Sequence, residues 1–368
     1  MPLVVDADSH VEESEATWAY LEDEFAARRP RVIQVPDAPW LKGFDAFWFI
    51  DGRLYPRPQG RGATIYSTPP LSTRARSKRF SVASQALADV DARLRDLDAL
   101  GLDVQVLFPT VFLEPLSADV RLESALMRSY NTWIAERCAH SGGRLRYVAV
   151  VPLRQPEAAA AEARRAAERG AVGLAILGTA GDLLLHDRSL DPFWAEAERL
   201  GLPVCVHVGW SHPGLTASGD SIYSAQLIGF TLPVLMGFFS IVGGGVLDRF
   251  PRLRVGFFEA GVSWLPYWIE RMDHYFHVDA PGAISPLPAR PPSEYLRRGQ
   301  LYFTCEGDER LLPAVLDLVG DECIMASADM PHAELRENTM AEIRERTDLS
   351  AATKAKILGA NAARFFGL

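Results

Sequence analysis

The chain alternates between short apolar runs and longer amphipathic segments. Each apolar run has about four to seven residues, is rich in Val, Leu, Ile or Phe, and is bounded by Gly, Pro or Asp. This pattern is typical of strands that are buried on both faces. It predicts eight strands: Leu3–Ala7, Val104–Phe108, Leu145–Val151, Val172–Leu177, Pro203–Val208, Leu253–Phe258, Leu301–Cys305 and Cys323–Ser327.

The segments between these runs carry apolar residues at helical spacing. Ser84–Leu100 is one example, and Gly101 directly after it is a suitable residue to end a helix. The full set of predicted helices is Ser84–Leu100, Leu122–Ala139, Pro156–Arg169, Pro192–Leu200, Tyr223–Ile241, Trp264–Tyr275, Glu309–Leu318, Ala333–Arg346 and Ala352–Phe366.

Strands that alternate with helices indicate right-handed crossovers and a parallel sheet. Eight such units predict a closed (β/α)₈ TIM barrel that forms a single domain over residues 1–368. A doubly wound open sheet is the alternative architecture.

One connection interrupts the alternation. Residues 14–80 form a long insertion after the first strand, and within it Phe47–Leu54, centred on Asp51-Gly52, is typical of a β-hairpin. Loops that follow barrel strands build the active site, so we expect the insertion to act as a lid. A surface for oligomerisation is the alternative role.

Composition narrows the functional classes. The chain has 38 basic and 47 acidic residues and a net charge of −9, which argues against a nucleic-acid partner. The cysteines Cys138, Cys205, Cys305 and Cys323 show no CxxC spacing, so neither a zinc ribbon nor a disulfide framework is expected.

The longest apolar stretch, Leu227–Val246, approaches the length of a membrane span. It is interrupted by Pro233 and by the run Gly243–Gly245, and we therefore interpret it as a buried helix followed by a loop. No signal peptide is evident at the N-terminus. We expect a cytoplasmic protein that acts on a small molecule and has no membrane partner. The segment Leu227–Phe239 would bury either against a second copy in a homodimer or against the insertion.

Titratable side chains gather where the predicted strands end. A single such residue is usually a capping or core group, but several at one end of a barrel would leave carboxylates buried without compensation. A divalent cation is the natural compensation. The residues concerned are Asp6, Asp8, His10, Glu12 and Glu13 after the first strand, and His207, Glu259, Glu306, Asp329 and His332 after later ones.

The first strand, Val5-Asp6-Ala7-Asp8-Ser9-His10-Val11, resembles the D-x-[H/D/E]-x-H opening of the amidohydrolase-related family, which includes the aminocarboxymuconate semialdehyde decarboxylase-like enzymes. The segment 326–332, Ala-Ser-Ala-Asp-Met-Pro-His, is similar to the family's SDxPH motif. Further similar segments are 206–209, 247–251 and 357–364. The resemblance implies a metal held by Asp8, His10, His207 and Asp329.

The chain departs from this family at one position. Decarboxylases of the family usually carry a histidine after the sixth strand, whereas this chain has Glu259, an acceptor-only group when ionised and a good ligand for a hard metal. Two histidines with several carboxylates form a ligand set typical of dinuclear iron sites. In this respect the chain resembles the non-haem dinuclear iron oxygenases of the same fold.

Two functions follow, and the first is preferred. A pair of Fe ions, or Fe and Mn, would activate O₂ in a monooxygenase that hydroxylates an unactivated carbon of a small apolar substrate. Alternatively, a single Zn or Mn would serve a hydrolase or a non-oxidative decarboxylase, with Asp329 as the base. The expected metal ligands are Asp8, His10, Glu13, His207, Glu259 and Asp329, with Glu12 and Glu306 left open; the expected catalytic residues are Glu259, Asp329 and His332.

Overall fold

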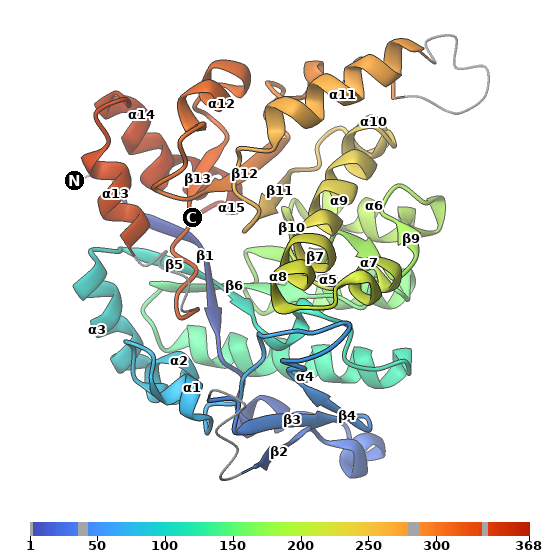
Figure 1. Cartoon of the computed structure of the whole chain (residues 1–368), viewed down its shortest axis with the longest axis vertical. Helices are drawn as coiled ribbons and strands as arrows, with labels where there is room; N and C mark the ends of the chain where they lie inside the picture. The colour runs from blue at the N-terminus through green and yellow to red at the C-terminus, as the bar shows by residue number, and fades with distance from the viewer. Residues whose placement is uncertain (1–2, 36–42, 279–287, 333–337) are drawn as a thin grey trace.

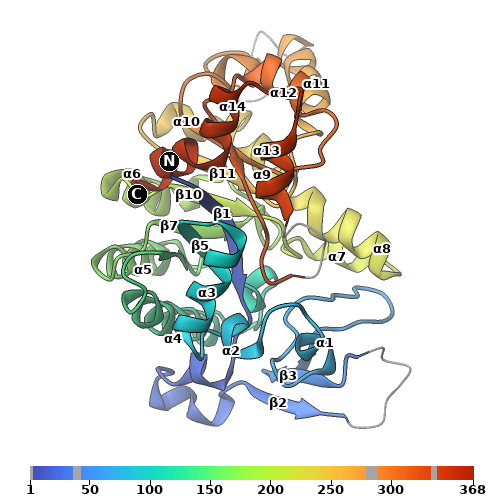
Figure 2. The same cartoon turned by 90° about the vertical axis from the view of Figure 1, so that its left-hand side faces the viewer.

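The chain folds as a barrel of parallel strands surrounded by helices (Figures 1 and 2). This computed structural model describes residues 3–35, 43–278, 288–332 and 338–368. The barrel strands are β1 (Val5–Val11), β5 (Val104–Pro109), β6 (Leu145–Val150), β7 (Gly173–Leu177), β10 (Val204–His207), β11 (Val255–Phe258), β12 (Leu301–Cys305) and β13 (Ile324–Ala326). They form one eight-stranded sheet in sequence order, so the predicted TIM barrel is confirmed.

The last strand returns to the first and closes the barrel. The Asp329 N–H donates to the Asp8 carbonyl at 3.0 Å, and the His10 N–H donates to the Met330 carbonyl at 2.6 Å. The strands are buried along almost their whole length, which explains their continuous apolar sequence. Among the polar exceptions, Asp8 and His10 of β1 are two residues apart and point to the same side, into the barrel.

Helices cover the outside of the barrel (Figure 1). The longer ones are α3 (Val90–Leu100), α4 (Val120–Ala139), α5 (Pro156–Glu168), α6 (Asp191–Leu200), α9 (Leu232–Val242), α11 (Leu265–Val278), α12 (Leu312–Val319) and α13 (Thr339–Glu345). The shorter ones are α1 (Thr73–Arg76), α2 (Val82–Gln85), α7 (Pro213–Ser218), α8 (Ile222–Ser224), α10 (Val246–Arg249), α14 (Ala351–Ala355) and α15 (Asn361–Phe366). Of the predicted helix Ala333–Arg346, residues 333–337 lie outside the described residues.

Three predicted helices are broken in the structure. Ser84–Leu100 divides into α2 and α3, because the Asp89 side chain accepts the Ala92 N–H at 3.0 Å and starts a new helix. Tyr223–Ile241 and Ala352–Phe366 each contain a π-helical segment, at Ala225–Thr231 and Lys356–Ala360. A π segment keeps the apolar periodicity nearly intact, so the pattern alone gives no sign of it.

The insertion contains the predicted hairpin. Strands β2 (Arg31–Gln34), β3 (Ala46–Ile50) and β4 (Arg53–Tyr55) form an antiparallel sheet beyond the end of β1 (Figure 1). Asp51 and Gly52 make the turn between β3 and β4 with φ of 47° and 79°, as a two-residue hairpin turn requires. The hairpin prediction is confirmed.

The apolar segment Ile222–Val242 is long and apolar enough to cross a membrane, but 56% of it is buried against the barrel. Gly178 lies after β7, where an added Cβ would come within 1.8 Å of the Pro233 carbonyl oxygen. The Phe238 ring lies 5.2 Å from both Phe257 and Trp264. This close packing is that of a core helix, as the glycine and proline residues indicated.

Candidate metal centre

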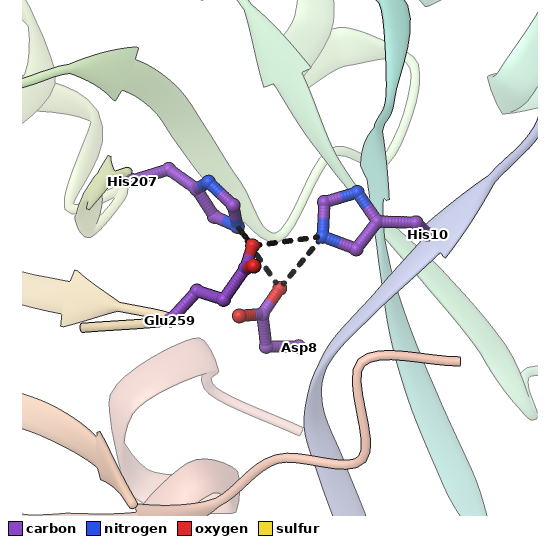
Figure 3. A group of neighbouring side chains, drawn as sticks. All are labelled: Asp8, His10, His207 and Glu259. Atoms are coloured by element: carbon purple, nitrogen blue, oxygen red, sulfur yellow. Dashed lines mark ion pairs between the residues drawn. The ribbon is translucent and has the colours of Figure 1, made fainter. Parts of the chain in front are cut away.

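Four side chains converge inside the carboxyl end of the barrel (Figure 3). Asp8 and His10 come from the same face of β1, His207 is the last residue of β10, and Glu259 directly follows β11. One ligand atom from each lies within 4.8 Å of the others, and all four residues are buried. The His207 Nε2 atom lies 3.4 Å from both Asp8 Oδ1 and Glu259 Oε2, and His10 Nε2 lies 3.5 Å from Asp8 Oδ1.

Backbone carbonyls fix the orientation of both imidazoles. The Nδ1 atom of His10 is 2.9 Å from the Pro109 oxygen, and Nδ1 of His207 is 2.9 Å from the Val208 oxygen. A carbonyl oxygen can only accept, so each Nδ1 carries the proton and donates it. Each neutral ring then presents the lone pair of Nε2 to the cluster, which is the arrangement of a metal-ligating histidine.

At the centre of the site, hydrogen-bond acceptors of the imidazoles therefore face the acceptor oxygens of carboxylates. Asp8 is fully buried, and neither of its oxygens has a hydrogen-bond donor among the described residues. The Nε2 atoms of His10 and His207 are likewise without a hydrogen-bond partner among those residues. Burying an uncompensated carboxylate costs several kcal/mol, so a bound cation fits this donor set.

Two of the acidic residues have an unusual backbone. Glu259 and Asp329 have positive φ values of 61° and 51°, a region in which residues other than glycine are strained. Their N–H groups hold them there: Glu259 N donates to Thr304 Oγ1 at 3.0 Å, and Asp329 N donates to the Asp8 carbonyl at 3.0 Å. Such strain is typical of functional sites, where the fold imposes a side-chain direction.

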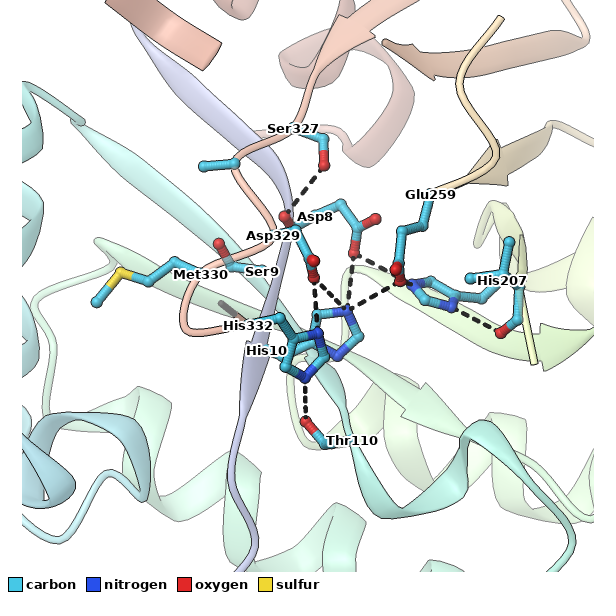
Figure 4. A network of polar contacts seen from close by, with 12 residues as sticks. Asp8, Ser9, His10, Thr110, His207, Glu259, Ser327, Asp329, Met330 and His332 are labelled. Atoms are coloured by element: carbon cyan, nitrogen blue, oxygen red, sulfur yellow. Dashed lines mark hydrogen bonds and ion pairs between the residues drawn. The ribbon is translucent and has the colours of Figure 1, made fainter. Parts of the chain in front are cut away.

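A second group of side chains overlaps the first (Figure 4). His10, Glu259, Asp329 and His332 also bring ligand atoms within 4.8 Å of one another. His10 Nε2 lies 3.4 Å from Asp329 Oδ1, and the rings of His10 and His332 stack with their centroids 4.2 Å apart. His10 and Glu259 belong to both groups, so the two groups form one continuous centre.

The Asp329–His332 pair holds a proton of its own. The Thr110 hydroxyl has one proton and donates it to the Val11 carbonyl at 2.7 Å, so it accepts from His332 Nε2 at 3.0 Å. With Nε2 protonated, the 2.8 Å contact between His332 Nδ1 and Asp329 Oδ1 contains a second proton. That proton belongs either to an imidazolium or to a carboxylic acid.

Burial and neighbouring charges shift the imidazoles in opposite directions. Burial, the largest cause, and the neighbouring His332 ring together lower the pKa of His10 to about 3. Burial also acts to lower the pKa of His207, but the Asp8 carboxylate outweighs it, and the net pKa of His207 is raised. In the absence of a cation, a proton on His207 therefore takes its place beside Asp8.

Three acidic residues considered from the sequence lie elsewhere. Both oxygens of Glu13 accept backbone N–H groups, from Thr110 and Val111, each at 3.0 Å. Burial raises the pKa of Glu13 to about 8, although these two donors favour its carboxylate. Glu13 thus lies outside both ligand groups, and its expected role as a ligand finds no support in this geometry. Glu12 pairs with Lys78, and Glu306 lies outside both groups.

Other buried side chains support the centre, and sequence reasoning missed two of them, Gln105 and Arg93. Asp6 accepts from Gln105 Nε2 at 3.0 Å and from the Ala328 N–H at 2.9 Å, and burial raises its pKa to about 6. The buried guanidinium of Arg93 donates to Gln105 Oε1 at 2.8 Å and to the His10 carbonyl at 3.0 Å. These residues position β1, and Gln105 and Arg93 could not be found from strand ends because they lie inside a strand and a helix.

An apolar cavity leads to the centre. Its volume is about 80 Å³, and its lining includes His207, Phe108, Phe112, Leu177 and Val151. The insertion reaches the opposite side of the centre through Tyr66, whose ring centroid lies 4.8 Å from that of His332. The role of residues 14–80 as a lid stays a prediction.

A family model described as amidohydrolase matches residues 55–368. The chain belongs to the amidohydrolase family. The γ-resorcylate decarboxylase of Rhizobium sp. (strain MTP-10005) is 30% identical over 301 residues, covering 76% of this chain and 87% of that protein. The 2-amino-3-carboxymuconate-6-semialdehyde decarboxylase of Dictyostelium discoideum is 28% identical over 285 residues, covering 76% of this chain and 77% of that protein.

Solved structures of the family have the same barrel. The 5-carboxyvanillate decarboxylase of Sphingomonas paucimobilis has a TM-score of 0.67 and 25% identity, covering 78% of this chain and 85% of that chain. An amidohydrolase from Mycobacterium avium subsp. paratuberculosis K-10 has a TM-score of 0.77 and 21% identity, covering 100% of this chain and 99% of that one. The 5-carboxyvanillate decarboxylase of Novosphingobium aromaticivorans, solved with manganese, has a TM-score of 0.73 and 21% identity, covering 100% of this chain and 96% of that chain.

These comparisons overturn the preferred reading of the sequence. Four of the five proteins named above are decarboxylases, which are lyases, and the resemblance to dinuclear oxygenases finds no support among the five. The expectation of a monooxygenase that uses O₂ is therefore wrong. It gave too much weight to Glu259, a single departure, and it needed Glu13 as a further ligand, which instead binds backbone N–H groups. The finding of a metal-dependent enzyme of this family remains, while a cytoplasmic location stays a prediction.

Proposed function

We propose that this protein is a metal-dependent, non-oxidative decarboxylase of a small carboxylated aromatic compound. The observation that carries the proposal is the buried centre of Asp8, His10, His207 and Glu259 at the end of an apolar cavity. The kinship to decarboxylases of carboxylated aromatics supports the same reaction.

One divalent ion fits the centre better than two. Its two candidate ligand groups share His10 and Glu259, so one ion within reach of both would also contact Asp8, His207 and Asp329. A mixture of imidazoles with a majority of carboxylates suits manganese better than zinc, which favours nitrogen and sulfur donors. The manganese in the related 5-carboxyvanillate decarboxylase supports this choice.

Charge balance supports an extra proton on the centre. Three buried carboxylates, those of Asp8, Glu259 and Asp329, exceed the charge of a divalent ion by one. The additional proton in the contact between Asp329 and His332 makes the centre neutral. A neutral centre can accept the carboxylate of a substrate without repelling it.

That proton also meets the chemical need of the reaction. A bound divalent ion supplies a Lewis acid that orients the substrate and withdraws electron density from it. When the bond to the carboxylate breaks, CO₂ leaves, the electron pair stays on the ring carbon, and one proton must be added there. The family resemblance implies a histidine for proton handling after the sixth strand, where this chain has Glu259. We assign the proton donor to the Asp329–His332 pair instead, with Thr110 fixing the His332 ring.

The apolar cavity suits an aromatic ring. Phe108 lies at the inner end of the cavity with its ring centroid 5.2 Å from that of His207. Phe112 and Leu177 continue the apolar wall. These side chains exclude water from the reacting carbon, so the proton comes from the enzyme and the carboxylate loses its hydration.

The test is CO₂ release without oxygen. Protein loaded with manganese is incubated anaerobically with 2,6-dihydroxybenzoate, 5-carboxyvanillate and related hydroxybenzoates, and the phenol and CO₂ are measured. We expect equal amounts of both for at least one compound, loss of activity in Asp8→Asn, and normal activity in Glu306→Gln, which removes a charge outside both ligand groups. Hydrolysis of an ester or amide without any decarboxylation would favour a hydrolase and refute the proposal.

A further inference from the structure

The path to the metal centre has an outer part that the proposed reaction does not explain. A cavity of about 1180 Å³ lies between the insertion and the barrel, far larger than the inner cavity of about 80 Å³. The two cavities adjoin, since both are lined by Glu114, Pro115, Arg154, Gly181 and Ser211. A substrate can therefore reach His207 through the outer cavity, and a single ring would leave most of that cavity empty.

The outer cavity is lined by arginine. Arg53, Arg57 and Arg61 come from the insertion, and Arg154 comes from the loop after β6. Among the residues that the structure describes, Glu114 is the only acidic side chain that lines this cavity, and burial raises its pKa to about 7. The lining is thus positive in a chain whose net charge is −9.

Three of these arginines form no close ion pair, although the charge of Glu114 acts on Arg57 and Arg53 at longer range. Arg154 is neutralised, because its Nε donates to Glu123 Oε2 at 2.9 Å. In contrast, no carboxylate of the described residues lies within ion-pair distance of Arg53, Arg57 or Arg61. An arginine that is not paired within the protein is available to a ligand, and its planar guanidinium suits a carboxylate, sulfonate or phosphate.

Arg57 is held in place for this role. Its Nη2 donates to the Gly62 carbonyl at 2.5 Å, and its backbone N–H donates to Thr64 Oγ1 at 3.0 Å. Gly62 has φ of +72°, and a Cβ there would lie 2.5 Å from Arg57 Nη2. The loop therefore fixes the guanidinium before a ligand binds, and fixing it in advance reduces the entropy lost on binding.

We infer that the substrate carries, besides the carboxylate that is lost, a second anionic group on an extension, and that Arg57 and Arg61 bind this group in the outer cavity. The inference rests on the proposed function for the part of the substrate that loses CO₂, and it adds the chemical class of the extension. The insertion then determines specificity: it selects an elongated dianion over the compact acids that the inner cavity alone would accept.

Two matched probes test this inference by binding alone. Each consists of 2-nitroresorcinol, in which a nitro group stands in place of the carboxylate so that no CO₂ can be lost, with a short alkyl chain on the ring carbon opposite the nitro group. The chain ends in a sulfonate in one probe and in a neutral hydroxyl in the other. Dissociation constants are measured by calorimetry on the manganese-loaded protein at low and at high salt. We expect the sulfonate probe to bind about tenfold more tightly at low salt, with a smaller preference at high salt.

Variants assign the effect to the arginines. The double variant Arg57→Gln/Arg61→Gln should reduce the preference to less than about threefold, whereas the matched control Arg95→Gln, an exposed arginine on α3, should leave it unchanged. Arg57→Lys, which keeps the charge, should retain most of the preference and shows that the loop still folds. Equal affinity of the two probes for the wild-type protein, or a preference that survives in the double variant, would overturn the inference. Because no turnover is measured, absence of decarboxylation would refute the proposed function without affecting this result.

Discussion

Replacement of Asp8 by asparagine should stabilise the metal-free protein and, at the same time, weaken the stabilisation that bound metal provides. Both imidazoles present the lone pair of Nε2 to Asp8, at 3.5 Å for His10 and 3.4 Å for His207. An asparagine amide offers donors where the carboxylate offers acceptors. At a pH above the raised pKa of His207, where no proton on that ring compensates Asp8, the metal-free Asp8→Asn protein should therefore be more stable than metal-free wild type.

The structure gives the size of both effects. Removing a buried charge without hydrogen-bond partners should stabilise the metal-free fold by about 1–2 kcal/mol, part of the several kcal/mol that such a charge costs. Metal at about 1,000 times its dissociation constant stabilises wild type by about 4 kcal/mol. If the variant binds about 100-fold more weakly, the same metal concentration adds only about 1.4 kcal/mol.

Thermal unfolding measures these differences. A chain of 368 residues has an unfolding entropy of roughly 0.8 kcal/mol per kelvin, so manganese should raise the Tm of wild type by about 5 °C and that of Asp8→Asn by about 2 °C. Without metal, the variant should unfold about 1–3 °C above wild type. A metal-free variant that is less stable than wild type, or an equal manganese shift in both proteins, would show that Asp8 is neither an uncompensated charge nor a ligand.

The remaining predictions concern the competition between a proton and manganese, the role of Glu13, and the packing of α9 against Gly178. Because the pKa of His207 is raised, its proton stabilises the metal-free fold fully below the ordinary pKa of 6.5, and this stability is lost as the pH rises through the raised pKa. Manganese competes with this proton, so the manganese affinity should fall about tenfold for each pH unit below the raised pKa. A manganese affinity that does not change with pH would contradict this. Glu13→Ala should cost about 2–3 kcal/mol in denaturant unfolding, because two buried N–H groups lose their acceptor, while the manganese content stays the same; a loss of metal would restore Glu13 as a ligand. Gly178→Ala should cost more than about 3 kcal/mol or prevent folding, and unchanged unfolding would refute the close contact with Pro233.

The barrel could be predicted from the sequence because its strands are buried on both faces and therefore appear as continuous apolar runs. Each of the eight barrel strands lies within a few residues of an apolar run, and the turn at Asp51-Gly52 is set by local backbone preference. The breaks within helices were not predictable in the same way. The π-helical segment at Lys356–Ala360 contains Gly359, where a Cβ would lie 1.8 Å from the Leu3 carbonyl oxygen, a contact between the two ends of the chain that local sequence does not reveal.

The candidate centre was predictable where residue type and strand end coincide. Asp8, His10, His207, Glu259 and Asp329 lie at such positions, and the structure brings them together. Glu13 has the same residue type but points to the N–H groups of the following strand's loop, a direction that sequence does not encode. Thr110 carried no signal except its place directly after the β5 strand, since a hydroxyl is common at any loop.

The reaction could not be deduced from one position. Glu259 changes the ligand set, yet the rest of the chain is similar to decarboxylases over most of its length. A carboxylate in place of an imidazole alters which atom handles the proton, and the neighbouring Asp329–His332 pair already contains a proton that can serve the same step. Counting ligands alone therefore favoured the wrong chemistry.

The central claim is that one divalent ion occupies the centre formed by Asp8, His10, His207 and Glu259. Its most direct test is elemental analysis of the protein purified from cells grown with both manganese and iron, compared with Asp8→Asn prepared in the same way. We expect about one divalent ion per wild-type chain and close to none per chain of the variant. Two iron ions per chain, or equal metal in both proteins, would contradict it.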